Sequence, residues 1–386
     1  MTTKPDHVLG NLTPAEFLDT CWQQDPCLIR QAIPDYLCPV SPEELAGLAC
    51  EPDTNSRIIL SHEDTGTWEV LYGPFSEKQF RELPDTHWTL LVQYVDRYNR
   101  AINDLLQHFR FIPNWRIDDV MISYAVDQGT VGPHLDSYDV FLLQGLGTRH
   151  WQINRNDYSE SDLIPGLDLR ILPEFNATEE WTVHPGDMLY LPPGVAHHGV
   201  ARGPCMTLSI GFLAPAYDEM VHDYLDRSMA AQLRYRDTHP VLQEHCGEIS
   251  RDTLETIRQN MRALLDDDRE LDHWFGTYIT GLQDIEEEDT DTHNNLIVDK
   301  FTEQFSRTGK LLRKPGLRTA YTTGNDELML YVNGLPWQLD TKQLGLVQII
   351  TGQTIIRFGE LDNLPDRDKN LDILFRLYTR GFYYFE

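Results

Sequence analysis

Two kinds of hydrophobic pattern follow one another along the chain. From about residue 57 to residue 214, apolar and polar residues alternate in short runs separated by Gly, Pro and Asp. The runs are RIILSH, TWEVLYG, DVMISYAV, YDVFLLQG, RHWQIN, WTVHPGDMLYLPPG and CMTLSIGF. A period of two residues is typical of strands with one buried face. Many such strands with turn residues between them predict a β-sandwich or barrel.

Helical patterns flank the strand-rich part. TPAEF and SPEEL each place a capping residue, Thr13 or Ser41, before a proline at the first helical position and a glutamate three residues after the cap. Residues 215 to about 285 contain few glycines and have the pattern of a helical hairpin or small bundle. The acidic stretch DIEEEDTDTHNN, residues 284–295, has the composition of an exposed linker, so we place a boundary there.

The C-terminal part combines helices with a hairpin. A helix is expected at about residues 296–306, and LMLYVNGLPWQL predicts a hairpin that turns at Asn333-Gly334. Two further helical stretches follow, and helices combined with a hairpin resemble a winged-helix module. We therefore expect an α+β protein with three parts, which are residues 1–214, 215–290 and 291–386.

The composition predicts a soluble protein of the cytoplasm. Hydrophobic residues make up 41% of the 386 positions, but no apolar run approaches the roughly eighteen residues that a membrane span needs. The first residues have neither a signal-peptide core nor a basic amphipathic pattern. The six cysteines have no Cys-x-x-Cys spacing, so we expect reduced thiols rather than a zinc knuckle or a disulfide framework.

The net charge of −29 narrows the choice of partners. A surface with this much negative charge repels phosphate backbones and anionic lipids and attracts cationic proteins. Residues 296–386 contain twelve Lys and Arg against eleven Asp and Glu. A winged helix that grips DNA would be clearly basic. We therefore expect a basic protein partner, no direct nucleic-acid binding, and a structural or protein-contact role for the C-terminal part.

A histidine and an aspartate stand two positions apart in GPHLDSYDVF. Side chains two apart on an extended segment share a face, so His134 and Asp136 can direct a nitrogen and an oxygen at one point. A later strand delivers His197 and His198, and only one of these neighbours should enter the same pocket. Two histidines and one carboxylate on one face of an octahedron leave three sites open, as in non-haem Fe(II) oxygenases. The alternative is a surface His-Asp pair and an unrelated core histidine.

An arginine stands among apolar residues in RHWQIN. The period of two puts Arg149, Trp151 and Ile153 on one face. A guanidinium inside a barrel is costly unless an anion satisfies it, and its planar fork suits a carboxylate. With a metal triad of this kind the natural anion is the far carboxylate of 2-oxoglutarate, and the alternative is a salt bridge to a protein carboxylate. We expect residues 144–147 to form a tight connection that folds the strand of Arg149 beside the strand that bears the ligands.

These residues resemble the JmjC/cupin family of 2-oxoglutarate oxygenases, in particular the bacterial ribosomal oxygenases that hydroxylate an arginine of a large-subunit ribosomal protein of the L-sixteen type. The likeness is carried, in chain order, by EFLDTCWQQDP, WRIDDVMISYAV, VGPHLDSYDVF, LYLPPGVAH and SIGFLAP. It extends over the whole chain. The resemblance implies a double-stranded β-helix barrel with N-terminal helices in residues 1–214, a helical dimerisation region in 215–290 and a winged-helix-like domain in 291–386.

The resemblance also implies site residues. The matching Fe(II) ligands are His134, Asp136 and His197. Arg149 matches the arginine that binds 2-oxoglutarate, and His198 falls at a position that is not a ligand. Ala125 stands where related sequences can carry a serine that helps to hold 2-oxoglutarate. The candidates to replace that hydroxyl are Ser123, Thr207 and Ser209.

A substrate arginine needs acidic and aromatic partners near the metal. The candidates are Asp118, Asp119, Tyr138 and Asp139. A carboxylate forms charge-assisted hydrogen bonds with a guanidinium, and Tyr138 can lie over the flat face of the cation. Alternatively, Asp118 and Asp119 cap a strand beside Arg116.

The expected function is that of an Fe(II)- and 2-oxoglutarate-dependent dioxygenase that hydroxylates an arginine side chain of a basic ribosomal protein. The enzyme is expected to be a homodimer that binds neither nucleic acid nor membranes. The same chemistry on a histidine or lysine of another basic protein, or N-methyl demethylation, would use the same triad. Two further alternatives are a non-catalytic cupin scaffold for a basic partner and a winged-helix regulator with a ligand-sensing barrel, against which the near-neutral C-terminal part argues.

Overall fold

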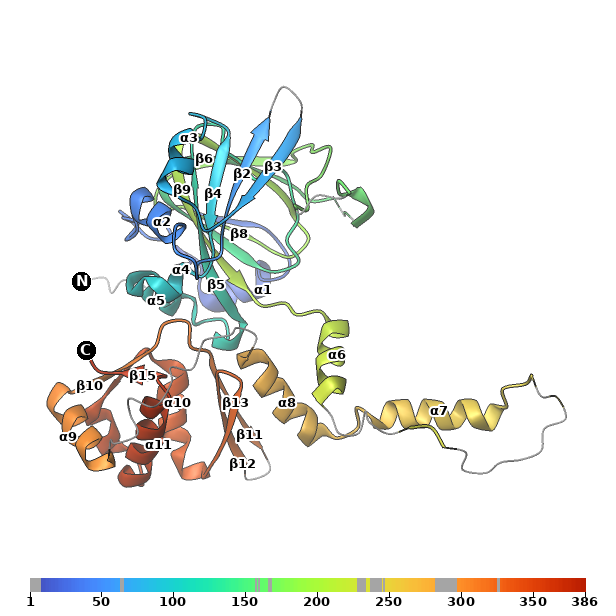
Figure 1. Ribbon diagram of the computed structural model, residues 1–386, viewed down its shortest axis with the longest axis vertical. Coiled ribbons are helices and arrows are strands. Elements are labelled where there is room, and N and C mark those ends of the chain that lie inside the picture. The colour runs from blue at the N-terminus through green and yellow to red at the C-terminus, as the bar shows by residue number, and fades with distance from the viewer. Residues whose placement is uncertain are drawn as a thin grey trace. The chain divides into compact units, whose positions relative to one another are not determined.

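The structure, a computed structural model, forms two compact units (Figure 1). One consists of Met1–Ala214 and Lys314–Gly316, and the other of Pro215–Arg313 and Leu317–Glu386. The described residues are 8–62, 66–156, 158, 160–165, 169–227, 234–236, 245, 247–281, 297–324 and 327–386. The predicted acidic linker, residues 284–295, lies outside them.

A single antiparallel sheet dominates the first unit. Its strand order is β1-β8-β6-β9-β5-β4-β2-β3, and β7 pairs with β6. The strands are β1 (Cys27–Ile29), β2 (Ser56–His62), β3 (Thr67–Tyr72), β4 (Trp88–Val92), β5 (Ile117–Ala125), β6 (Val140–Asn154), β7 (Glu179–Val183), β8 (Met188–Leu191) and β9 (Ala196–Phe212). The sheet curves into a barrel, because residues of β2, β4, β5, β6 and β9 line one common cavity.

The predicted break between YDVFLLQG and RHWQIN is wrong. Both stretches belong to β6, which pairs with β9 along almost its whole length. The register shifts between Gln144 and Leu146 and again between Leu146 and Thr148. Gly147, whose φ is 65°, allows the second irregularity. The glycines therefore make bulges that bend a continuous strand instead of a turn that ends it.

The two faces of the sheet have different partners. Ile58, Leu90 and Ile122 belong to the main core of the unit, which also contains Phe17 and Ile102 of the N-terminal helices. The next residue along each strand points the other way, toward the cavity. The cavity-facing neighbours are Ile59, Leu91 and Ser123. Helices thus cover one face of the sheet and leave the other face for the site.

Two of the N-terminal helices, α1 (Pro14–Thr20) and α2 (Pro42–Leu48), begin at the predicted caps. The others are α3 (Glu77–Glu82), α4 (Val95–Tyr98) and α5 (Arg100–Leu105). In α1 the Thr13 hydroxyl accepts a hydrogen bond from the Glu16 N–H at 3.2 Å, and the Glu16 carboxylate accepts one from the Thr13 N–H at 2.8 Å. Ser41 and Glu44 form the same capping box at α2. Both predicted helix starts are confirmed.

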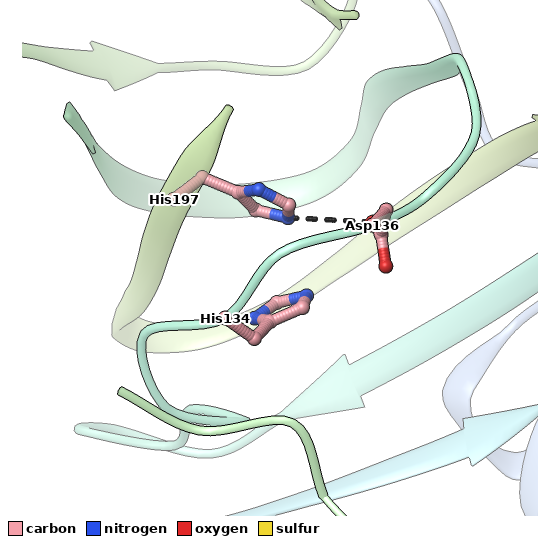
Figure 2. Close-up of side chains that lie close together, drawn as sticks. All are labelled: His134, Asp136 and His197. Carbon is pink, nitrogen blue, oxygen red and sulfur yellow. Dashed lines mark ion pairs between the residues drawn. The ribbon is translucent and has the colours of Figure 1, made fainter. Parts of the chain in front are cut away.

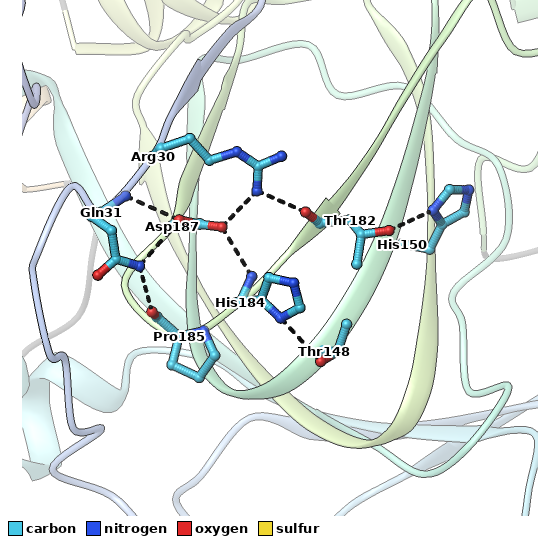
Figure 3. Close-up of polar contacts among 8 residues, drawn as sticks. All are labelled: Arg30, Gln31, Thr148, His150, Thr182, His184, Pro185 and Asp187. Atoms are coloured by element: carbon cyan, nitrogen blue, oxygen red, sulfur yellow. Dashed lines mark hydrogen bonds and ion pairs between the residues drawn. The ribbon is translucent and has the colours of Figure 1, made fainter.

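The Pro-Gly-Asp turn between β7 and β8 is held by its aspartate (Figure 3). Asp187 is buried and accepts hydrogen bonds from the Arg30 guanidinium at 2.7 Å, the Gln31 N–H at 3.0 Å and the His184 N–H at 3.1 Å. Burial by itself would raise the pKa of Asp187, but the hydrogen bonds from Gln31, Arg30 and His184 lower it overall. The carboxylate therefore ties the segment after β1 to the turn between β7 and β8, two strands that pair with β6.

The second unit contains helices and two small sheets. The helices are α6 (Tyr217–Arg227), α7 (Arg251–Ala263), α8 (Asp268–Thr280), α9 (Val298–Thr308), α10 (Leu344–Gly352) and α11 (Arg367–Thr379). The sheets are β14-β10-β15 and β11-β12-β13. Their strands are β10 (Lys310–Arg313), β11 (Thr319–Gly324), β12 (Glu327–Val332), β13 (Leu335–Leu339), β14 (Ile355–Arg357) and β15 (Tyr383–Tyr384). Within the described residues, short 3₁₀ helices cover Leu106–Phe109, Asn114–Arg116, Glu160–Asp162, Thr341–Gln343 and Phe358–Asn363.

The predicted hairpin is present in this unit. β12 and β13 pair with a turn at Asn333-Gly334, where both residues have positive φ, as a two-residue hairpin turn requires. Helix α8, from the predicted helical region, packs on this hairpin, since Gly334 donates a hydrogen bond to the Thr280 hydroxyl at 3.1 Å and Arg269 pairs with Glu327 at 3.0 Å. Within the described residues, none of the helices has the length and apolar character required to cross a membrane.

Candidate active site

A cavity of about 380 Å³ lies within the barrel. Strands β2, β4, β5, β6 and β9 and the segment before β6 contribute its wall. Apolar residues such as Leu91, Met121 and Leu142 alternate in this wall with charged and polar ones. An apolar pocket with a few converging polar groups is the usual form of a small-molecule site.

Three candidate metal ligands converge on this cavity (Figure 2). One nitrogen each of His134 and His197 and one carboxylate oxygen of Asp136 lie within 4.8 Å of one another. Nε2 of His197 lies 3.6 Å from Oδ2 of Asp136. Within the part of the chain that the structure describes, these are the residues that form such a cluster. Figure 2 shows the two rings and the carboxylate directed at a common point.

Backbone pairing holds the two histidines together. His134 and His197 form a β-bridge, with N–H to carbonyl distances of 3.0 and 2.9 Å in the two directions. Each Nδ1 lies within hydrogen-bond distance of a backbone carbonyl, that of Gly132 for His134 at 2.9 Å and that of Val195 for His197 at 3.0 Å. An Nδ1–H donated to a carbonyl leaves Nε2 as the free ligand atom. Both imidazoles are therefore oriented to bind a metal through Nε2.

The neighbouring histidine faces away. His197 is buried and lines the cavity, whereas His198 is outside the cavity wall and packs against Phe175. The prediction that one of the pair enters the pocket is confirmed. Burial, together with the nearby His134, lowers the pKa of His197 to about 4. A neutral imidazole is the form that binds a metal.

Arg149 lies in the wall of the same cavity with 2% of its surface exposed. Its Nη1 donates to the hydroxyls of Ser123 at 3.2 Å and Thr207 at 3.3 Å, and its Nη2 donates to the Gly199 carbonyl at 3.4 Å. The guanidinium carbon lies 5.0 Å from the centre of the Trp151 ring. The predicted alternation of β6 is confirmed, because Arg149 and Trp151 are both buried on the cavity side.

The guanidinium of Arg149 has no anionic partner among the described residues. All its hydrogen-bond acceptors are neutral, and its Nε is buried with no acceptor. Burial lowers the pKa of Arg149, although an arginine remains protonated at neutral pH. A buried cation without a carboxylate suits an anionic ligand in the cavity. The donor set and this cation together fit a metal ion and a carboxylate-bearing cosubstrate.

Comparisons with known proteins agree with this geometry. The JmjC domain family matches residues 104–220, the ROXA-like winged helix family matches residues 263–384, and the AraC-like ligand binding domain family matches residues 176–283. The chain is 31% identical over 377 residues to the ribosomal protein uL16 3-hydroxylase of Escherichia coli K12, an alignment that covers 96% of this chain and 97% of that protein. The chain belongs to the JmjC family of ribosomal oxygenases. A probable ribosomal oxygenase of Haemophilus influenzae is 36% identical over 218 residues, which are 56% of this chain and 52% of that protein.

Solved structures of a ribosomal oxygenase have the same fold. The crystal structure of YcfD from E. coli superposes with a TM-score of 0.84 at 32% identity and covers 97% of this chain and 99% of that one. The complex of YcfD with cobalt and 2-oxoglutarate gives a TM-score of 0.81 at 31% identity, with coverage of 97% and 99%. The JmjC/cupin barrel and the C-terminal winged helix expected from the resemblance are thereby confirmed.

Three of the four predicted substrate-binding residues of this ribosomal oxygenase line the cavity. They are Asp118, Asp119 and Tyr138. Consecutive residues of a regular strand face opposite sides, but the register of β5 against β9 shifts between Ile117 and Val120. This bulge brings both carboxylates to the cavity wall. The charge of Asp136, then burial and the charges of Asp119 and Asp118, raise the pKa of Tyr138, so its phenol stays neutral.

Asp139 does not join this group, which corrects the prediction. Its side chain is fully buried away from the cavity wall. It accepts hydrogen bonds from Tyr190 at 2.7 Å, Gln23 at 3.0 Å and Arg116 at 3.2 Å. Arg116, beside which Asp118 and Asp119 would cap a strand in the alternative interpretation, pairs with Asp139. With these partners Asp139 is a structural residue.

The structure places three of the four residues considered, besides Arg149, for holding 2-oxoglutarate in the cavity wall. Ser123, Thr207 and Ser209 line the cavity, whereas Ala125 is absent from its wall and is buried among small side chains of β5 and β9. Thr207 also donates to the Gln144 amide oxygen at 3.1 Å. Ser123 lies one pleat from Ala125 on the same face of β5, which is why it can reach Arg149.

Residues that the sequence interpretation missed also line the cavity. They include Arg57, Gln93, Met121 and Arg170. For Arg57 a signal was present, because the alternation in SRIILSH puts it on the same face as Ile59, inside the barrel. It is the same signal that singled out Arg149 in RHWQIN.

Proposed function

We propose that this protein is an Fe(II)- and 2-oxoglutarate-dependent hydroxylase that adds one hydroxyl group to an arginine side chain of a basic large-subunit ribosomal protein in the cytoplasm. One observation carries the proposal most directly. The buried Arg149, which has only neutral acceptors among the described residues, lies in the same cavity wall as the cluster of His134, Asp136 and His197. A non-catalytic scaffold would not need candidate metal ligands beside a buried arginine that lacks a charged partner.

The residues of the cavity divide the proposed work. His134, Asp136 and His197 would hold Fe(II) on one face and leave the other coordination sites to ligands. Iron and 2-oxoglutarate, when bound, supply the oxidising power for attack on an unactivated carbon. Arg149 would bind the far carboxylate of 2-oxoglutarate, with Ser123 and Thr207 fixing the guanidinium. Ser209 offers a further hydroxyl in the same wall.

The carboxylates of the cavity wall and the negative charge of the whole protein support an arginine as the modified residue. Asp118 and Asp119 place two carboxylates at the cavity, and a substrate guanidinium can bind such groups through charge-assisted hydrogen bonds. Tyr138 is 41% exposed, which leaves its ring accessible to stack on a planar cation. A net charge of −29 attracts a basic protein over a longer range. The name of the E. coli relative, ribosomal protein uL16 3-hydroxylase, supports a ribosomal protein as the substrate.

A mass measurement tests the function. The purified protein is incubated with Fe(II), ascorbate, 2-oxoglutarate and arginine-containing peptides from basic ribosomal proteins, and we expect one added oxygen atom on an arginine together with release of succinate. Oxygen on a histidine or lysine instead would reassign the substrate. Turnover of neither peptide nor 2-oxoglutarate by metal-loaded protein would leave a non-catalytic scaffold and refute the proposal.

Two adjacent histidines give a matched control for the metal site. His197→Ala removes a proposed ligand, so we expect loss of bound iron and of oxygen addition. His198→Ala changes a neighbour that lies outside the cavity wall, and we expect metal content and activity close to those of the unchanged protein. Equal losses in the two variants would contradict the assignment of the ligands.

We also propose that the helical region, residues 215–290, forms a homodimer contact. Helix α7 has no buried residue, and Leu254, Ile257 and Met261 are exposed at helical spacing by 43%, 40% and 59%. Exposed apolar stripes of this kind usually mark an interface. Light scattering is expected to show a dimer that Ile257→Lys converts to a monomer, whereas Gln259→Lys on the same helix leaves it intact. A dimer that persists in Ile257→Lys would place the contact elsewhere.

A further inference from the structure

A second arginine lies in the wall of the cavity. Arg57 is on β2, where its register partners are Tyr72 of β3 and Leu91 of β4. Along β2, Ile58 belongs to the main core, while Arg57 and Ile59 line the cavity. The guanidinium therefore comes from an inward position, as that of Arg149 does.

The side chain of Arg57 has no hydrogen-bond or ion-pair partner among the described residues. Its Nε is buried and unsatisfied. The same wall contains the carboxylates of Asp118, Asp119 and Asp136, yet Arg57 pairs with none of them. A buried N–H group without an acceptor is uncommon in folded proteins and is costly to maintain. Its presence in a cavity wall indicates that the acceptor comes from a bound molecule.

The chemistry of the expected ligands limits what that acceptor is. A guanidinium only donates, and the acceptor oxygens of 2-oxoglutarate and of a peptide main chain belong to carboxylates and carbonyls. In the proposed function, Arg149 binds the far carboxylate of 2-oxoglutarate, and the metal binds its other end. Neither end of the cosubstrate is then left for Arg57. A basic protein segment contains few carboxylates, but each of its residues has a main-chain carbonyl.

We propose that Arg57 binds a main-chain carbonyl oxygen of the substrate segment next to the modified residue. This inference rests on the proposed function and extends it to the main chain of the substrate. The acidic residues of the cavity bind the cationic side chain, and Arg57 fixes the backbone from which that side chain extends. Together they set how deeply the target carbon enters the cavity. Arg57 is in this sense a substrate-binding residue that acts independently of sequence.

Binding measurements test the proposal without relying on turnover. A fluorescent arginine-containing peptide is titrated into protein loaded with Co(II) and 2-oxoglutarate. We expect Arg57→Gln to weaken peptide binding about tenfold or more, as loss of a hydrogen bond to a charged group does, and to leave the affinity for 2-oxoglutarate within about twofold. Arg81→Gln is the matched control, because Arg81 is an exposed residue of α3 that pairs with Glu77.

A change in the peptide backbone identifies the contacted atom. Replacing single amides beside the arginine by esters weakens the carbonyl as an acceptor. At one position we expect the ester to reduce the affinity of the unchanged protein but not that of Arg57→Gln, because the partner is already gone in the variant. Arg57→Lys retains the charge and supplies a second folded variant, and we expect it to recover part of the peptide affinity.

The outcomes separate this inference from the proposed function. Unchanged peptide affinity in Arg57→Gln, or a parallel loss of 2-oxoglutarate affinity, overturns the role of Arg57. Peptide binding that depends on Arg57 without addition of oxygen overturns the proposed function and leaves the carbonyl contact standing. A metal-loaded protein that binds no arginine peptide overturns both.

Discussion

Two buried charges in the barrel, only ten residues apart in the sequence, have opposite surroundings. Asp139 is fully buried and is satisfied by Arg116, Tyr190 and Gln23. Arg149 is 2% exposed and reaches only hydroxyls and a carbonyl. The charge of Asp139 is paired within the protein, whereas the charge of Arg149 is paired, in the proposed function, by an anion in the cavity.

The difference shows how a buried charge can be interpreted. Taking a charge out of water is expensive, and a protein offsets this cost with a partner unless a ligand supplies it. Asp139 contributes to folding because its partners are always present. Arg149 has no charged partner of this kind, and in the proposed function it adds to the affinity of the protein for an anion. Burial alone therefore does not identify a functional residue, whereas a buried charge without a charged partner in a cavity wall indicates a residue that binds a ligand.

The largest expected effect comes from Asp139. Asp139→Ala leaves Arg116 without its carboxylate and removes an acceptor from Tyr190 and Gln23, so we expect the free energy of unfolding to fall by about 3–5 kcal/mol, as for other broken buried pairs. Denaturant unfolding measures this. Asp25→Ala, which removes an exposed partner of Arg155, is expected to change it by less than about 1 kcal/mol. If Asp139→Ala changed the free energy of unfolding only slightly, Asp139 would not be the structural residue that the comparison with Arg149 requires.

Arg149→Gln is expected to weaken the binding of 2-oxoglutarate strongly and to change the stability of the protein little. Loss of the charged fork should raise the KM for 2-oxoglutarate about a hundredfold, or roughly 2.7 kcal/mol. Stability should change by less than about 1 kcal/mol, because no carboxylate loses its partner. Turnover assays and denaturant unfolding measure the two quantities. A variant that unfolds readily but still binds 2-oxoglutarate would show that Arg149 is structural.

Local patterns in the sequence predicted much of this site. The alternation in RHWQIN placed Arg149 with Trp151 on the inner face, and the same rule separated His197 from His198. The caps at Thr13 and Ser41 and the turn at Asn333-Gly334 depend on residues a few positions apart. These features were predictable because the forces that determine them act over one turn of helix or a few residues of strand.

Features that depend on distant parts of the chain were not predictable in this way. Asp139 was grouped with Asp118 and Asp119, because its partners Gln23 and Tyr190 lie far away in the sequence. The β-bulges could not be predicted from the local sequence pattern either. The irregularity in β5 aligns two consecutive carboxylates, and those in β6 turn a predicted break into one long strand.

The rise in Tm that 2-oxoglutarate causes should distinguish Arg149 from Asp139. A ligand that binds only the folded protein stabilises it by about 1.4 kcal/mol at ten times its dissociation constant. We expect 2-oxoglutarate with Co(II) to raise the Tm of the unchanged protein in this way, and to do so at the same concentrations in folded Asp139→Asn. Arg149→Gln should lose the cosubstrate-dependent part and keep any rise due to Co(II) alone. An equal shift in all three proteins would mean that the anion binds elsewhere.

The smallest expected effect concerns the hydroxyls that position Arg149. Ser123→Ala removes one neutral acceptor of the guanidinium, a hydrogen bond worth about 1 kcal/mol, so the KM for 2-oxoglutarate should rise about fivefold. Thr207→Val should raise this KM by a similar factor. In the double variant the KM should rise by less than the product of the two single factors, because both hydroxyls fix the same Nη1. Because both hydroxyls are neutral, their contacts orient the cation without neutralising it. An effect as large as that of Arg149→Gln would mean that the hydroxyls themselves hold the anion.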